Sequence, residues 1–102
     1  MSFERDGYRW EGAFTSADSL ESRAGIYMVW CRSGDTWTAL DVGESHNVQE
    51  RVRYHDRADQ WRRACRGALH FAAHYTPHLQ ATGRREIEKR IRTLENPTCG
   101  DR

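Results

Sequence analysis

Hydrophobic residues along the chain form three short runs that are typical of buried strands. The first, residues 25–31 (GIYMVWC), is continuous and rich in β-branched and aromatic side chains. Residues 36–43 (TWTALDVG) follow after four turn-forming residues, so the two runs predict a hairpin. A third run, residues 68–75 (ALHFAAHY), begins directly after Gly67. We therefore expect a central three-stranded antiparallel sheet.

Apolar residues at helical spacing predict helices around that sheet. Ser45 is a good N-cap for a helix over residues 46–57, and a second short helix is expected over residues 59–65. The last helix is expected to start where Thr76 precedes a proline and to continue to about Glu95. Its core stripe repeats every three or four positions and comprises Leu79, Gly83, Ile87, Ile91 and Leu94. The predicted class is mixed α/β (α+β), with the sheet flanked by helices.

Residues 1–24 read as an extended N-terminal arm. Its aromatic residues Tyr8, Trp10 and Phe14 stand at even spacings. They either cover part of the core or form a platform on which bases stack. A chain of 102 residues has room for one core, so we expect one domain over residues 1–102, with its core over residues 25–100.

Apolar content and cysteine usage favour a cytoplasmic protein without a membrane partner. No apolar run approaches the roughly 20 residues of a spanning helix, and the N-terminus lacks the apolar stretch of a signal peptide. Cys31, Cys65 and Cys99 are odd in number and far apart. We expect them to be reduced thiols packed as small hydrophobic residues. Zinc binding with His70 or His74 is the alternative, although no tight ligand spacing supports it.

Charge patterning points to an anionic partner. The net charge is only +1, but fifteen of the sixteen basic residues are arginines. They cluster in residues 50–66, with six arginines against three acids, and in residues 84–92, with four arginines and one lysine against two acids. Arginine binds phosphate in a bidentate manner better than lysine does. The two clusters suggest a focused anionic contact, although composition alone favours the alternative that these are ordinary solvated helix faces.

Two short motifs and their spacing resemble the GIY-YIG nuclease superfamily. Gly25-Ile26-Tyr27 on the first strand and Asp41-Val42-Gly43 on the second correspond to the two motifs of that family. Arg51 stands eight positions beyond Gly43, as the family's helix arginine does. His55 follows one helical turn later, and Glu88 lies nine residues before Pro97, matching the family's later glutamate. The resemblance covers about residues 24–100.

The chain departs from the family pattern at two positions. Asp41 stands where the family has the tyrosine that opens its second motif, and Gly100 stands where it has an asparagine three residues past the proline. Both positions usually lie near the active site of the family.

The resemblance implies a metal-assisted site that cuts phosphodiester bonds, and the residue types suit that chemistry. Glu88 would bind Mg²⁺ or Mn²⁺, and Arg51 would hold the non-bridging phosphate oxygens. Tyr27 would orient or deprotonate the attacking water, with His55 as general base or proton shuttle. Asp41 would be a second metal ligand or proton acceptor, or else a turn residue bonded to the backbone of Gly43 and Glu44.

Each of these residues also has a structural reading. Tyr27 on an apolar strand fits a core, and His55 fits a partly buried helix position. Glu88 stands four residues from both Arg84 and Arg92, so a ladder of salt bridges explains it as well, with Glu86 left in solvent.

Three functions follow from these observations. The leading one is a small metal-dependent endonuclease or DNA-processing domain, in which a partner protein or a homo-oligomer supplies sequence specificity. The second is a non-catalytic nucleic-acid binder on the same scaffold. The third is a protein-interaction module with an exposed aromatic surface made of Trp10, Trp30, Trp37 and Trp61.

Overall fold

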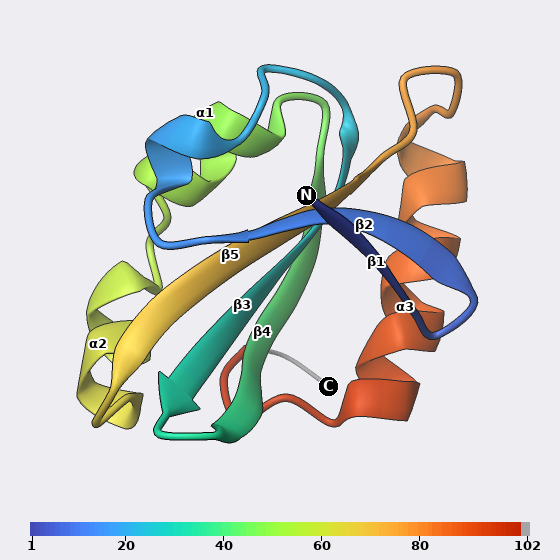
Figure 1. Cartoon of the computed structure of the whole chain (residues 1–102). Helices are drawn as coiled ribbons and strands as arrows, with labels where there is room; N and C mark the ends of the chain where they lie inside the picture. The colour runs from blue at the N-terminus through green and yellow to red at the C-terminus, as the bar shows by residue number, and fades with distance from the viewer. Residues whose placement is uncertain (101–102) are drawn as a thin grey trace.

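A five-stranded antiparallel sheet forms the centre of residues 1–100, the part of the chain that the computed structural model describes (Figure 1). Its strands lie in the order β1-β2-β5-β3-β4. They comprise β1 (Ser2–Arg5), β2 (Tyr8–Phe14), β3 (Gly25–Ser33), β4 (Thr36–Ser45) and β5 (Ala68–Tyr75). The helices are α1 (Val48–Arg53), α2 (Ala58–Ala64) and α3 (Ala81–Glu95), with a short 3-10 turn at Ala17–Ser19. The α+β class and the β3–β4 hairpin agree with the sequence prediction; the domain end predicted at residue 102 lies outside the described residues.

The prediction of three strands is wrong because the N-terminal arm adds two more. β2 pairs antiparallel with β5, and β1 pairs with β2. Trp10 on β2 has an exposed fraction of 0%, and Phe14 pairs in register with Phe71. Tyr8 and Trp10 therefore show the period-two alternation of one strand face, whereas a register shift between Glu11 and Phe14 places Phe14 against the core on the other face.

Each face of the sheet carries its own hydrophobic core. In Figure 1, α1 and α2 lie on one side of the sheet and α3 on the other. Tyr27, Leu40 and Trp61 belong to the core under α1 and α2. Met28 and Ile91 belong to the core under α3. No helix within residues 1–100 is long and apolar enough to cross a membrane.

The last helix starts later than predicted and ends as predicted. The Thr76 N–H donates to the Ala24 carbonyl at 2.8 Å, and this bond ties Thr76 to the chain that enters β3. The helix therefore begins only at Ala81. It ends at Asn96, which adopts the left-handed conformation (φ 48°) of a C-cap. Ile91 of the predicted stripe is buried, but Leu94 is 59% exposed because the helix ends one residue later.

The predicted helix over residues 46–57 is shorter and has a different cap. Asn47 is the N-cap: its side chain accepts from the Glu50 N–H, while Ser45 belongs to β4 and bonds to Asn47. The helix stops at Arg53, where the chain turns His55 inward. The second short helix, Ala58–Ala64, agrees with the prediction to within one residue at each end.

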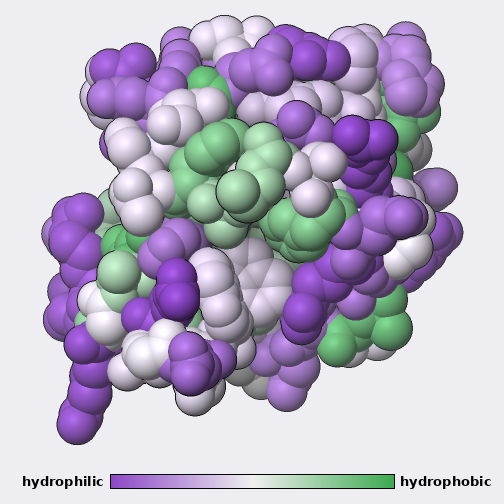
Figure 2. All heavy atoms as spheres, in the orientation of Figure 1, coloured by the Kyte–Doolittle hydropathy of each residue, from purple (hydrophilic) through white to green (hydrophobic). Residues whose placement is uncertain are grey.

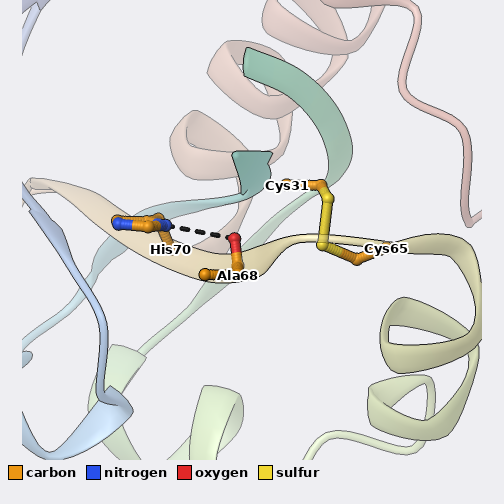
Figure 3. Close-up of a disulfide and its surroundings, with 4 residues drawn as sticks. All are labelled: Cys31, Cys65, Ala68 and His70. Atoms are coloured by element: carbon orange, nitrogen blue, oxygen red, sulfur yellow. Dashed lines mark hydrogen bonds between the residues drawn. A yellow bond between two sulfur atoms is a disulfide. The ribbon is translucent and has the colours of Figure 1, made fainter. Parts of the chain in front are cut away.

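Two cysteines form a disulfide, which overturns the expectation of reduced thiols. Cys31 on β3 and Cys65 after α2 are joined, with a Cα–Cα distance of 5.4 Å (Figure 3). Cys31 pairs in register with Leu69 of β5, so strand pairing brings the chain before β5 close to it. Cys99 is free and buried. Because disulfides persist mainly in oxidising compartments, cysteine usage no longer supports a cytoplasmic location.

Candidate active site

Tyr27, Arg51 and Glu88 line one pocket of about 650 Å³ at the β4 edge of the sheet, between α1 and α3. They come from three different elements: Tyr27 from β3, Arg51 from α1 and Glu88 from α3. The lining residues share a predominantly polar and basic character and comprise Tyr27, Gly43, Glu44, Arg51, Arg57, Arg85, Glu88, Lys89, Arg92, Thr93 and Asn96. Three residues selected by sequence spacing therefore meet in space.

Gly43 lets Tyr27 reach this pocket. The two residues pair in register across the hairpin, and the phenol ring lies over Gly43. A Cβ atom at Gly43 would lie 2.0 Å from the Tyr27 hydroxyl oxygen and 2.2 Å from Cζ. Only glycine leaves room for the ring here, so the glycine of the second motif positions the tyrosine of the first.

The hydroxyl of Tyr27 is bonded to His55, which lies behind it. Tyr27 Oη and His55 Nε2 are 2.7 Å apart, and the Arg57 backbone N–H donates to His55 Nδ1 at 3.0 Å. A neutral imidazole whose Nδ1 accepts carries its proton on Nε2. Nε2–H therefore donates to Tyr27 Oη, and the tyrosine keeps its own O–H proton available for another acceptor.

Burial sets the protonation states of both residues. Burial lowers the pKa of His55 to about 4, with Arg51 and Arg57 adding to the effect, so the imidazole is neutral at pH 7. Burial, together with the charge of Asp41, raises the pKa of Tyr27 to about 12. Tyr27 is therefore a protonated phenol that accepts a hydrogen bond from His55; the general-base role expected of His55 does not fit this geometry.

Asp41 is fully buried and saturated with hydrogen-bond donors. Oδ2 accepts from Arg57 Nε and Trp61 Nε1, both at 2.8 Å. Oδ1 accepts from Arg92 Nη2 at 2.7 Å, from Arg57 Nη2 at 3.3 Å and from the Val42 N–H at 2.9 Å. A carboxylate has about four lone-pair positions, so none remains for a metal ion or a proton. Asp41 instead fixes two arginines that line the pocket, and its backbone partner is Val42 rather than Gly43 or Glu44.

A β-bulge directs Asp41 to this side of the sheet. The β3–β4 register shifts between Val29 and Trp30, so Val29 faces Asp41 while Trp30 faces Ala39. Leu40 is the extra residue, and it enters the same core as Trp61. Bulges re-aim side chains in this way, often beside active sites.

Both departures from the family pattern lie at the same point. The turn after α3 brings the chain back along β4, where the Cys99 N–H donates to the Leu40 carbonyl at 2.7 Å. Gly100 follows with φ +88°, and a Cβ there would lie 2.8 Å from Asp41 Oδ1 and 2.7 Å from Arg92 Nη2. The Asp41–Arg92 pair fills the space that a side chain at position 100 would need, so the two departures are sterically coupled.

The pocket has an excess of positive charge. Five lining residues are basic (Arg51, Arg57, Arg85, Lys89 and Arg92) and two are acidic (Glu44 and Glu88). Glu44 is bonded to Arg84 at 2.8 Å. Arg51 pairs with the exposed Asp56 at 3.0 Å and keeps 39% of its side chain exposed. An anionic ligand matches this surface.

Glu88 is the acidic residue best placed to bind a cation. Its Oε2 accepts from Arg92 Nε at 3.2 Å, and no hydrogen bond to Oε1 is present within the described residues. Burial raises the pKa of this carboxyl above its ordinary value, despite the opposing effect of Arg92. The expected pair with Arg84 is absent because Arg84 binds Glu44, whereas the pair with Arg92 forms.

The donor set fits a Mg²⁺ ion that takes most of its ligands from the substrate and from water. Residues 1–100 contain no group of three or more His, Cys, Asp or Glu side chains that could enclose a metal ion. Mg²⁺ usually binds proteins through one or two carboxylates together with substrate phosphates. Glu88 meets that requirement; the alternative zinc site at His70 or His74 does not form.

Sequence reasoning missed Arg57 and Arg92, which connect the site. Arg92 bonds to both Asp41 and Glu88, and Arg57 bonds to Asp41 and, through its N–H, to His55. The only signal was the four-residue spacing between Glu88 and Arg92, which a plain salt bridge also explains. Among fifteen arginines, nothing in the sequence distinguished these two.

Comparisons of the chain with protein-family models, with curated proteins and with solved structures found no match. The likeness to the GIY-YIG nucleases therefore rests on the motif residues alone.

Proposed function

We propose that the chain is a small endonuclease that hydrolyses phosphodiester bonds in DNA with Mg²⁺ or Mn²⁺, on a fold similar to that of GIY-YIG nucleases. The observation that carries this proposal is the meeting of Tyr27, Arg51 and Glu88 in one basic pocket, although they come from three elements. A phosphodiester supplies the anionic group that this pocket matches.

Each residue of the pocket would have a role that follows from its charge and from the position of its proton. Arg51 and Arg57 hold the phosphate oxygens, and Asp41 keeps Arg57 in place through two hydrogen bonds. The Tyr27 O–H donates to a phosphate oxygen, because His55 already donates to Tyr27 Oη. Glu88 would hold the metal ion. When bound, that ion would add positive charge where negative charge develops on the phosphate and the leaving oxygen.

Asp41 acts in this scheme as a positioning residue. It aligns two arginines from a fully buried site, and its distance from solvent keeps its charge unscreened. Gly100 leaves the space that this arrangement needs.

The second candidate is a nucleic-acid binder that does not cut. It is favoured by one observation: Arg92 bonds to the only carboxylate in the pocket that is not held by Arg84 or Arg85. If that ion pair persists in the complex, the basic pocket binds phosphate without recruiting a metal ion. The third candidate, an exposed surface of four tryptophans, does not fit, since Trp10, Trp30 and Trp61 are buried.

The deciding experiment is cleavage of supercoiled plasmid and of branched DNA by the full chain in Mg²⁺ or Mn²⁺. We expect Glu88→Gln to lower the cleavage rate by at least about 100-fold, as loss of a key electrostatic group in an active site does. The matched control is Glu86→Gln, an exposed residue two positions away on α3 that does not line the pocket and should cut like the wild type.

The possible results separate the candidates. Equal cleavage by wild type and Glu88→Gln removes Glu88 from the mechanism. Absence of cleavage together with salt-sensitive DNA binding supports the non-catalytic binder. Absence of both cleavage and binding contradicts both candidates.

A further inference from the structure

A second pocket, of about 390 Å³, lies away from the candidate active site and is lined by aromatic residues and arginines. Trp30 and Arg32 stand two residues apart on β3 and so point to the same face of the sheet. In register, Trp30 pairs with His70 of β5, and Arg32 pairs with Trp37 of β4. β1 and β2 complete the wall, and the full lining comprises Met1, Ser2, Phe3, Arg5, Gly12, Ala13, Trp30, Arg32, Trp37 and His70. We call this the aromatic pocket.

The aromatic pocket lies on a face whose centre is hydrophobic. Figure 2 shows green and pale residues gathered in the middle of the face that carries β1 and β2, with purple hydrophilic residues around them. Trp37 is 42% exposed, whereas Trp30 at 4% and His70 at 8% are buried. An exposed ring thus stands at the entrance, above two buried rings.

The rings are arranged for stacking and are flanked by cations. Trp37 makes edge contacts with His70 at a centroid distance of 4.8 Å and with Trp30 at 6.3 Å. The guanidinium of Arg5 lies 4.5 Å from the centroid of Trp30, and that of Arg32 lies 5.3 Å from the centroid of Trp37. The pocket thus combines three aromatic rings in T-shaped contact with two planar guanidinium groups.

One buried polar atom in the pocket wall, Trp30 Nε1, lacks a partner within the described residues. Trp30 Nε1 is buried and donates no hydrogen bond. His70 Nδ1 bonds to the Ala68 carbonyl at 3.1 Å, and Figure 3 shows the other ring nitrogen at the far end of the ring. A neutral imidazole that donates from Nδ1 leaves Nε2 as an acceptor. Buried polar groups are normally satisfied, so a ligand with an acceptor atom for Trp30 Nε1 suits this wall.

The charge of the lining indicates which ligand this is. It contains two arginines and no acidic residue, although Glu95 pairs with Arg5 from outside the pocket. A proline-rich peptide needs aromatic rings but gains nothing from two cations. A nucleotide has a planar base with polar edges and an anionic phosphate, and it uses every one of these features.

We propose that the aromatic pocket binds an unpaired nucleobase of a single-stranded nucleic acid, stacked against Trp37, with Arg32 and Arg5 near its phosphates. This site does not depend on the proposed endonuclease activity. Tyr27 and Trp30 are three residues apart on β3, about 10 Å along the strand. Because this spacing is odd, the two side chains point to opposite faces of the sheet and belong to different cores.

The test is equilibrium binding of fluorescently labelled oligothymidylate and oligouridylate to the full chain, without divalent metal ions, read by fluorescence anisotropy. Loss of one stacked base costs about 1–3 kcal/mol, so Trp37→Ala is expected to bind about 5- to 150-fold more weakly. Trp37→Phe keeps an aromatic ring, so its affinity is expected to lie between those of the wild type and Trp37→Ala. Comparison of the two oligonucleotides tells whether DNA or RNA is the better ligand.

The matched control is Tyr54→Ala. Tyr54 is 73% exposed and has Arg53 over its ring at 5.6 Å, but it lines neither pocket. It should bind like the wild type, and circular dichroism would verify that all variants fold. The proposal is overturned if wild type does not bind either oligonucleotide, if Trp37→Ala binds as tightly as wild type, or if Tyr54→Ala loses as much affinity.

Failure of this proposal and failure of the endonuclease proposal are distinguishable. A chain that cuts DNA while Trp37→Ala binds normally contradicts only the aromatic pocket. A chain that binds single strands through Trp37 but cuts nothing contradicts only the endonuclease.

Discussion

At the scale of single residues, the hydrogen bonds of His55 set its protonation state. His55 lies under Tyr27, is 5% exposed, and has both ring nitrogens in hydrogen bonds, of which the one accepted by Nδ1 requires the neutral form. Protonation would force Nδ1 to give up its bond from the Arg57 N–H. The residue that the family pattern offers as a proton carrier thus serves here to orient the hydroxyl of Tyr27.

The lowered pKa of His55 makes the stability of the fold depend on pH. The folded pKa is about 4, against an ordinary value of 6.5, so between these values the unfolded chain binds more protons. Stability is therefore fully present above pH 6.5 and falls as the pH drops toward 4. From pH 7 to pH 5, we expect the wild type to lose about 1–2 kcal/mol more unfolding free energy than His55→Gln.

Urea unfolding of both proteins at each pH measures this difference. Other groups that titrate in this range, such as Asp6, are present in both proteins and cancel in the comparison. Equal losses in the wild type and His55→Gln would show that His55 is not held neutral.

At the scale of elements, the β3–β4 pairing positions the site through Gly43. A methyl group there would meet the Tyr27 ring, whose buried position leaves it little room to move. Overpacking of this kind costs about 1–3 kcal/mol. We expect Gly43→Ala to lower the unfolding free energy by that amount and to displace the Tyr27 hydroxyl from His55.

Gly83 provides the matched control for that substitution. It lies inside α3, and a Cβ there would meet Leu79 at 3.5 Å, an ordinary contact. Gly83→Ala should therefore raise stability by about 0.5–1 kcal/mol, since alanine favours a helix interior over glycine. If urea unfolding shows that both variants change the unfolding free energy in the same direction, the packing described at Gly43 is contradicted.

The elements that could be predicted from the sequence are those with a strong local signal. The hairpin and the third strand are marked by apolar runs, and the end of α3 by Asn96-Pro97. The pairing of the N-terminal arm, the disulfide and the late start of α3 depend on long-range contacts: β2 with β5, Cys31 with Cys65, and Thr76 with Ala24. Such contacts leave little trace in a local pattern.

The candidate site was predictable for a similar reason. Fixed spacing selected Tyr27, Arg51 and Glu88, and all three line one pocket. The roles of Asp41 and His55 were not predictable, because they depend on partners such as Trp61 and Arg57 that only the fold brings near. Asp41 and His55 were expected to be reactive groups. Their burial, which sequence spacing does not indicate, makes them positioning groups instead.

At the scale of the whole molecule, the chain carries two recognition sites of different chemistry. The candidate active site is basic and holds one available carboxylate, whereas the aromatic pocket combines rings with arginines. Together the two proposals give a domain that would bind phosphate at one site and a base at the other. The central claim is that a metal ion and a phosphate meet at Glu88.

The most direct test locates Mn²⁺ in the isotope-labelled full chain bound to a short DNA duplex, by paramagnetic broadening of its amide NMR signals. The account predicts broadening centred on α3 around Glu88 and on Gly43 and Glu44, kept in Glu86→Gln and lost in Glu88→Gln. Broadening that is spread evenly over the chain, or that Glu88→Gln leaves unchanged, would contradict it.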